Sequence, residues 1–177
     1  MLSNIIIVLA VLIVGLLVYA ATRPNSFRVQ RSTRIDAAPA AIFPHVNDFH
    51  KWSAWSPWEH LDPAMQRSHS GAASGKGAVY AWEGNKKVGK GRMGIIDSAP
   101  PARVIIKLDF LAPFEAHNTT EFTMVEYGQS TDVTWDMHGP SPFMSKLIGI
   151  FMNMDAMIGK DFERGLAGLK KVAEQRA

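Results

Sequence analysis

The sequence IIIVLAVLIVGLLVYAA, from Ile5 to Ala21, sets the architecture of this chain. It contains no charged residue and no proline. A helix needs about 20 apolar residues to cross the hydrocarbon core of a bilayer, and it pairs its backbone polar groups internally, as lipid requires. We therefore expect residues 1–21 to be a transmembrane anchor, residues 22–26 a polar junction and residues 27–177 one folded domain.

A cleaved signal peptide is the alternative for this N-terminal stretch. The sequence Val18-Tyr19-Ala20 lacks the usual small-x-small cleavage pattern, and no Lys or Arg precedes the apolar run. The run is also longer than the roughly 7–15 residues of a typical signal-peptide core. These features favour a retained anchor.

The arginines near the anchor predict its orientation. Arg23, Arg28, Arg31 and Arg34 all follow the apolar stretch, and no cation precedes it. Because cytoplasmic flanks carry the excess of Lys and Arg, we expect a single-pass protein of the cell membrane whose domain lies in the cytoplasm.

Composition argues against several classes of partner and cofactor. The net charge is +3, with 19 Lys+Arg against 16 Asp+Glu, and no basic run indicates nucleic-acid binding. The chain has no cysteine, and its six histidines lack metal-site spacing such as HExxH, so no metal site is expected. No nucleotide-binding fingerprint is present, and no cofactor is expected.

The domain shows patterns typical of antiparallel strands. A first strand at Phe27–Ile35 and a short helix are followed by five or six short strands rich in β-branched and aromatic residues. Five of these are Ala78–Glu83, Lys87–Ile96, Val104–Phe110, Thr119–Tyr127 and Ser130–Met137. Their short connections favour an antiparallel meander.

One long amphipathic helix is expected after Gly139-Pro140. Apolar residues recur at spacings of three and four from Leu147 to Val172, with a kink around Met152–Asp155. A curved sheet that buries one face and a helix that covers this face together predict an α+β fold.

Strand alternation predicts an apolar interior. On Val104–Phe110 the apolar side chains face one way, whereas Lys107 and Asp109 face the other. An inner face without paired carboxylates indicates binding rather than catalysis, and no catalytic residue is assigned. The residues expected to line or rim an apolar cavity are Trp52, Trp55, Trp58, Tyr80, Trp82, Met93, Leu108, Phe110, Phe122, Trp135, Met137, Met154, Ile158 and Phe162.

The tryptophans of the segment Trp52–Trp58 have two interpretations. They either fasten this segment onto the open end of the sheet as part of the core, or form the rim of a ligand cavity. Rigid aromatic side chains with one polar atom suit both roles. The two interpretations are compatible with each other.

Several short motifs point to a known family when taken in order. They are the opening strand with its continuation RIDAAPAAIF, WSAWSP at Trp52–Pro57 with Asp62-Pro63, VGKG at Val88–Gly91, Val133-Thr134-Trp135 and KDFERGLAGLKKVAE at Lys160–Glu174. In these the chain resembles the polyketide cyclase/dehydrase-like branch of the START/Bet v 1-type (SRPBCC, helix-grip) superfamily. The resemblance implies a curved antiparallel sheet around a long C-terminal helix, with a cavity that binds a lipid, sterol, polyketide or other apolar molecule. It supplies no universal catalytic residue.

Three functions are compatible with these observations. The first is membrane-anchored, non-catalytic binding of a hydrophobic small molecule or lipid. The second is a cyclase or dehydratase acting on a membrane-soluble substrate, with Tyr80, Glu83 or His117 as the acid–base group. The third is a protein-interaction module that uses the Trp52–Trp58 segment. The sequence favours the first.

Overall fold

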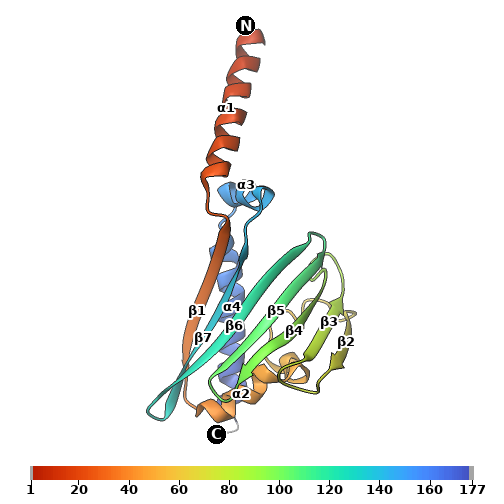
Figure 1. The fold of residues 1–177 in the computed structure, drawn as a ribbon, viewed down its shortest axis with the longest axis vertical. Helices are drawn as coiled ribbons and strands as arrows, with labels where there is room; N and C mark the ends of the chain where they lie inside the picture. The colour runs from red at the N-terminus through yellow and green to blue at the C-terminus, as the bar shows by residue number, and fades with distance from the viewer. Residues whose placement is uncertain (1, 176–177) are drawn as a thin grey trace.

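A seven-stranded antiparallel sheet curves around one long helix, and a separate N-terminal helix projects away from both (Figure 1). The computed structural model describes residues 2–175. In chain order the elements are α1 (Leu2–Thr22), β1 (Ser26–Ile35), α2 (Pro39–Asn47), the 3-10 helix η1 (Phe49–Ala54), β2 (Gln66–Gly71), β3 (Ala78–Glu83), β4 (Lys90–Ala99), β5 (Arg103–Ala112), β6 (Ala116–Tyr127), β7 (Ser130–Pro140), α3 (Phe143–Phe151) and α4 (Met154–Glu174).

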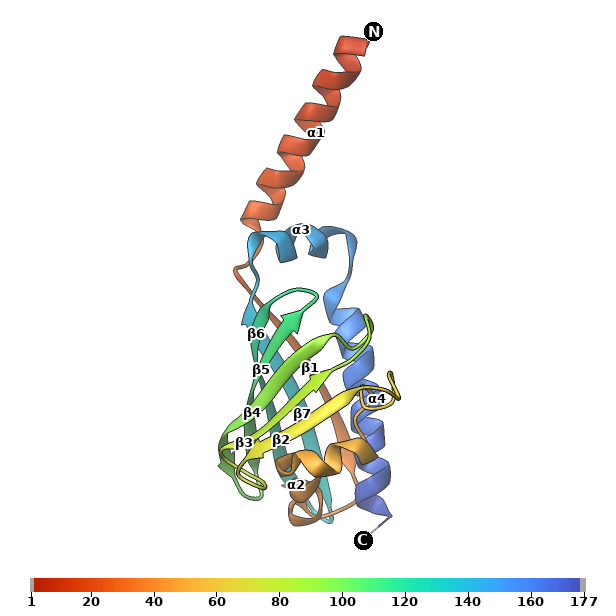
Figure 2. The same cartoon turned by 90° about the vertical axis from the view of Figure 1, so that its right-hand side faces the viewer.

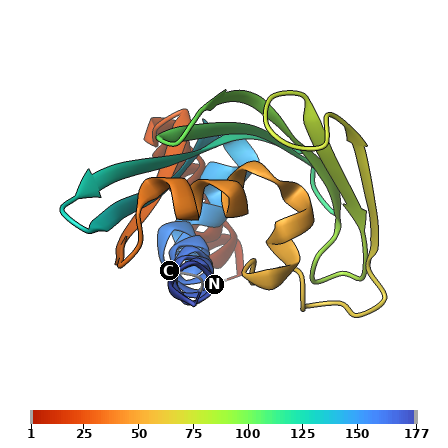
Figure 3. The same cartoon turned by 90° about the horizontal axis from the view of Figure 1, so that it is seen from below.

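The strands β2 to β7 form an antiparallel meander, and the first strand of the chain pairs with the last. Its strand order is β1-β7-β6-β5-β4-β3-β2, so β2 to β7 each pair with the next strand in sequence and β1 closes on β7. All pairs are antiparallel. Seen from below, the sheet forms an arc whose concave side holds α4, α2 and η1 (Figure 3). This arrangement confirms the α+β helix-grip fold expected from the sequence.

Two segments differ from the sequence expectations. Strand β2, QRSHSG, was not expected, because its side chains are all exposed and show no apolar alternation. The expected single C-terminal helix is wrong: the chain forms two helices, α3 and α4, separated at Met152-Asn153. The side chain of Asn153 accepts a hydrogen bond from the backbone N–H of Ala156 and so caps the start of α4.

Helix α1 projects away from the domain, which it contacts through α3 at its C-terminal end (Figures 1 and 2). Among the described residues it is the one helix long and apolar enough to cross a membrane, with a mean hydropathy of 2.9 over Asn4–Thr22. A signal sequence near the N-terminus can also meet these criteria of length and hydropathy. Most of its large apolar side chains are exposed, so the domain does not use α1 as a core helix.

Glycines on α4 let the sheet and the loop segments approach the helix closely. A Cβ atom at Gly165 would lie 2.6 Å from Cζ3 of Trp135, and one at Gly168 would lie 2.5 Å from the carbonyl oxygen of Trp55. A Cβ at Gly159 would overlap the Arg31 guanidinium, which crosses the helix to pair with acidic residues of α4. These contacts explain why a helix interior carries residues that weaken helices.

Replacing Gly165 with alanine is therefore expected to destabilise the protein. In an open helix the same change stabilises by roughly 0.8–1.0 kcal/mol, but here the added methyl group meets the ring of Trp135, and overpacking typically costs about 1–3 kcal/mol. Denaturant unfolding of the full chain in detergent micelles measures the difference. Gly149→Ala in α3 is the matched control, since a Cβ there meets nothing within 4 Å. Equal stability of the two variants would contradict the close-approach argument.

Candidate ligand-binding site

An aromatic cluster fills the space between the concave face of the sheet and α4. At its centre the ring of Trp135 on β7 stacks on Phe162 of α4, with ring centroids 4.2 Å apart and planes 6° apart. The ring centroid of Phe122 lies 4.6 Å from that of Trp135, and Trp55 and Trp58 form T-shaped pairs with Trp135 at centroid distances of 5.7 and 5.6 Å. Such offset and edge-to-face pairs add stability beyond their buried area. The interior at this level is occupied by the protein's own side chains.

The indole N–H groups of the buried tryptophans all bond inside the domain. Trp52 and Trp55 donate to the carbonyl oxygens of Val46 and His45 on α2, at 3.0 and 2.9 Å. Trp135 donates to the Thr120 hydroxyl at 2.8 Å. Both Trp52 and Trp55 are only 4% exposed. Their rings also contact Phe122 and Trp135 of the sheet, so both are core residues that fasten the α2–η1 segment to it. Of the three tryptophans in the Trp52–Trp58 segment, Trp58 is the half-buried one.

Burial of the apolar inner face falls toward one end of the domain. We call this the anchor end: α1 leaves there, and it carries the starts of β1 and α4 and the last residues of β3, β5 and β7 (Figure 1). Side chains toward the other end, such as Ile35, Val104 and Leu169, have no exposed surface. At the anchor end the inner apolar side chains are only half-buried; these are Phe27, Trp58, Trp82, Leu108 and Ile158. Val172 near the end of α4 is half-buried as well, so the apolar interior is less completely covered at the anchor end than toward the other end.

Thirteen of the residues expected from the sequence to line a cavity lie together in or against this core. Eight are buried: Trp52, Trp55, Tyr80, Met93, Phe122, Trp135, Met137 and Phe162. Five are half-buried: Trp58, Trp82, Leu108, Phe110 and Ile158. Met154, the first residue of α4, is instead exposed at the anchor end. The contacts place these residues side by side; whether they hold a ligand stays a prediction.

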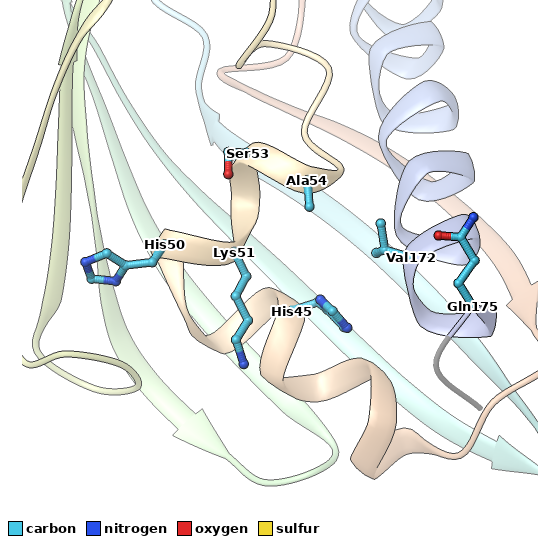
Figure 4. A pocket seen from close by; sticks show the side chains of 7 residues that line it. All are labelled: His45, His50, Lys51, Ser53, Ala54, Val172 and Gln175. Atoms are coloured by element: carbon cyan, nitrogen blue, oxygen red, sulfur yellow. The ribbon is translucent and has the colours of Figure 1, made fainter.

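The clefts found on the surface lie away from this cluster. One, of about 240 Å³, opens between α2, η1 and the C-terminal end of α4, and His45 faces Val172 and Gln175 across it (Figure 4). Its lining mixes polar and apolar side chains, with His50, Lys51 and Ser53 beside Ala54 and Val172. A second, shallow hollow lies on the outer side of α4 beside Lys160 and Glu163. Neither is lined by any residue expected to line the apolar cavity.

Three polar side chains, Glu59, Arg67 and Tyr80, interrupt the apolar interior where β3 meets the loop after η1, and we call them the polar corner. The hydroxyl of Tyr80 donates to Oε1 of Glu59 at 2.6 Å, and Nε of Arg67 donates to Oε2 at 2.7 Å. Burial and then the hydrogen bond to Glu59 raise the pKa of Tyr80. Tyr80 therefore keeps its proton at neutral pH and points it at Glu59. The sequence pattern missed Glu59 and Arg67, because Glu59 lies in a loop without periodicity and Arg67 in the polar strand β2.

Residues 26–174 match the family described as polyketide cyclase/dehydrase and lipid transport. This chain belongs to that family. The match spans the whole sheet and α4, and it leaves α1 outside.

Solved structures share the fold of this polyketide cyclase/dehydrase family member at low sequence identity. A Chromobacterium violaceum protein has a TM-score of 0.58 and 14% identity, over 86% of this chain and 99% of its own. A Mesorhizobium loti protein has a TM-score of 0.59 and 13% identity, over 85% of this chain and 99% of its own. BexL, a di-domain ARO/CYC of the BE-7585A biosynthetic pathway, has a TM-score of 0.62 and 18% identity, over 89% of this chain and 53% of its own. The comparison with curated proteins gives no match.

The other two acid–base residues considered from the sequence do not face the interior of this family domain. Glu83 is exposed on β3 and pairs with Lys90 at 2.8 Å. His117 lies on the outer face of β6, where its Nδ1 is 2.7 Å from the buried carboxylate of Asp109. The hydrogen bond to Asp109 raises the pKa of His117. Burial favours a higher pKa for Asp109, but hydrogen bonds from His117 and Arg92 outweigh it and lower that pKa. Of the three, only Tyr80 lies on the inner face.

Proposed function

We propose that this domain binds an apolar small molecule or lipid without catalysing its conversion, and that α1 anchors it in the membrane that supplies the ligand. The observation that carries the proposal is that apolar side chains on the inner face of the sheet and on α4 are less buried toward the anchor end than toward the other end. Apolar surface left half-covered there favours an apolar ligand, at about 25 cal/mol per Å² removed from water. Because α1 leaves from the same end, the incompletely covered part of the interior is held close to the bilayer.

The division of the chain follows from this proposal. Residues 1–21 are the anchor, residues 22–26 the junction and residues 27–177 the ligand-binding domain. Arginines on the domain side of the anchor support a cytoplasmic location for the domain. The family description includes lipid transport, which agrees with an apolar ligand.

A photoactivatable probe tests the proposal on the full chain. The protein is placed in phosphatidylcholine nanodiscs that contain a fatty acid bearing a diazirine, and light-induced crosslinks are mapped by mass spectrometry. We expect crosslinks at the anchor ends of β3 and β5, around Trp82 and Leu108, in addition to those in α1. Crosslinks confined to α1 and the surface helices would contradict ligand binding inside the domain.

Two matched variants locate the bound probe. Leu108→Asn adds a polar group to the half-buried rim at the anchor end, and we expect it to reduce crosslinking inside the domain several-fold. Val172→Asn makes a comparable change at a half-buried position near the C-terminal end of α4, remote from the anchor end. We expect it to leave crosslinking unchanged. Equal effects of the two variants would contradict the placement of the site.

A cyclase-type reaction is the second candidate function, and the polar corner is the observation that favours it. BexL is described as an ARO/CYC, and Tyr80 is the one inner-face residue of the three considered for acid–base chemistry. Against it, the raised pKa of Tyr80 keeps the phenol protonated and makes it a weak acid, and its proton is donated to Glu59. Tyr80→Phe separates the two functions: it would abolish turnover of a polyketide substrate, whereas probe crosslinking would persist.

A further inference from the structure

Helix α3 exposes apolar side chains and buries its one charged residue, which is the opposite of what is expected for a helix in water. Its sequence is FMSKLIGIF, and its one charged residue, Lys146, is turned inward with only 9% of its surface exposed. Apart from Ser145 the exposed side chains of α3 are apolar, and Met144 and Phe151 have 61% and 73% of their surface exposed. We call the exposed residues Phe143, Met144, Ile148 and Phe151 the α3 face. A helix facing water normally buries its apolar side chains and exposes its charges.

The orientation of α3 is fixed by bonds to the junction that follows α1. Nζ of Lys146 donates to Oδ1 of Asn25 at 2.5 Å, and the backbone N–H of Ser141 donates to the carbonyl oxygen of Asn25 at 2.7 Å. Because Lys146 is bound to Asn25 on the inner side of α3, the apolar side chains of the α3 face point outward. Helices α1 and α3 are also in contact, and Ala20 near the end of α1 is fully buried.

Helix α3 lies at the level where a membrane-spanning α1 would leave the bilayer. It runs across the base of α1, at the end of the domain from which α1 projects (Figure 2). At the same level the Arg23 guanidinium lies 5.8 Å from the ring centroid of Tyr19. Tyr and Arg side chains at the end of an apolar helix are typical of the headgroup region. Exposed methionines continue the apolar surface beyond the α3 face, at Met152, Met154 and Met157.

We propose that α3 is an interfacial helix whose exposed apolar face lies in the headgroup region of the bilayer that α1 spans. The bilayer is the occupant that the structure favours, because the α3 face is continuous with the apolar surface of α1 and carries no charge. Amphipathic helices bind bilayers in this way, with the apolar face at the boundary of headgroups and acyl chains. The inference rests on the membrane anchoring in the proposed function. It adds a second contact, which holds the anchor end of the domain against the lipid surface instead of leaving it on a flexible tether.

Spin labels on single cysteines test this contact in the full chain, because the native sequence has no cysteine. Met144→Cys and Phe151→Cys report on the α3 face, and Val11→Cys reports on α1. Val125→Cys is the matched control: Val125 is 62% exposed near the far end of β6. Each labelled protein is reconstituted in vesicles of phosphatidylcholine and phosphatidylglycerol. The collision rates of the label with oxygen, which concentrates in lipid, and with a water-soluble nickel chelate are then compared.

We expect the oxygen-to-nickel collision ratio at positions 144 and 151 to exceed that at position 125 several-fold and to approach that at position 11. Equal ratios at 144, 151 and 125, with a lipid-like ratio at 11, would overturn the interfacial helix and leave the anchor intact. Low collision rates with both reagents at 144 and 151 would place another protein surface, such as a second copy of the chain, on the α3 face and would also overturn it. A water-like ratio at position 11 would overturn the anchor and the inference together. Circular dichroism of each variant confirms that the fold is retained.

Discussion

Replacing Trp135 with alanine is expected to lower the free energy of unfolding by about 3–5 kcal/mol, the range for a large aromatic side chain deleted from a packed core. Trp135 is the central ring of the aromatic cluster: it stacks on Phe162 and contacts Phe122, Trp55 and Trp58. Its removal would also take away the N–H donor to the Thr120 hydroxyl. Urea unfolding of the full chain in micelles, followed by far-ultraviolet circular dichroism, measures the loss.

Trp58→Ala is the matched comparison for this prediction. Trp58 contacts Trp135 and Phe162 but is only half-buried, so its removal is expected to cost about 1–2 kcal/mol. Trp58 also belongs to the half-covered rim at the anchor end, and we expect its loss to change probe crosslinking inside the domain. A small loss of stability for Trp135→Ala, similar to that of Trp58→Ala, would show that the cluster is loosely packed.

The packed cluster constrains how a ligand can be held. Close-packed interiors leave few voids, and core residues toward the far end such as Ile35, Val104 and Leu169 are fully buried. A bound molecule therefore has to lie over the half-buried side chains at the anchor end, or displace movable groups such as Trp58. Most of the exposed large apolar side chains of the described residues lie on the two helices beside this end, α1 and α3. The ligand site and the lipid contacts are thus proposed for the same end of the molecule.

The fold could be predicted from the sequence because strand alternation and helix periodicity both report burial. On β5 the alternation correctly separates inward Val104 and Ile106 from outward Lys107. The same rule puts Asp109 outward, which is its face, but it could not indicate that neighbouring cations would cover this carboxylate. The strand β2 escaped prediction because an exposed edge strand needs no apolar alternation.

The parts of the site that escaped prediction depend on contacts between distant segments. Apolar spacing runs on through Met152-Asn153, so the sequence predicted one helix, although it placed a kink at the position where the chain breaks into α3 and α4. The inward turn of Lys146 depends on Asn25, far away in sequence. Glu59, in the loop after η1, likewise finds its partners Tyr80 and Arg67 on strands β3 and β2. Local patterns carry no information about such pairings.

Removing Arg67 is expected to destabilise the protein by roughly 3–5 kcal/mol, because it leaves the buried carboxylate of Glu59 without its compensating charge. The guanidinium also donates to the carbonyl oxygens of Glu59 and Met65, at 2.7 and 2.8 Å. In the Arg67→Met variant these acceptors lose their donors. The same unfolding measurement gives the loss.

Lys90→Met is the matched control, because the Glu83–Lys90 pair joins neighbouring strands at a similar distance but is exposed on both sides. Exposed pairs contribute about 0–1 kcal/mol, so this variant is expected to remain close to the native stability. The double variant Glu59→Gln/Arg67→Met removes the buried charge along with its partner and should recover much of the loss. If it recovers stability and still crosslinks the apolar probe, the polar corner is a structural device that satisfies a buried carboxylate. A double variant as unstable as Arg67→Met would show instead that the hydrogen bonds of Arg67 to the backbone, and not the charge of Glu59, fix this corner of the domain.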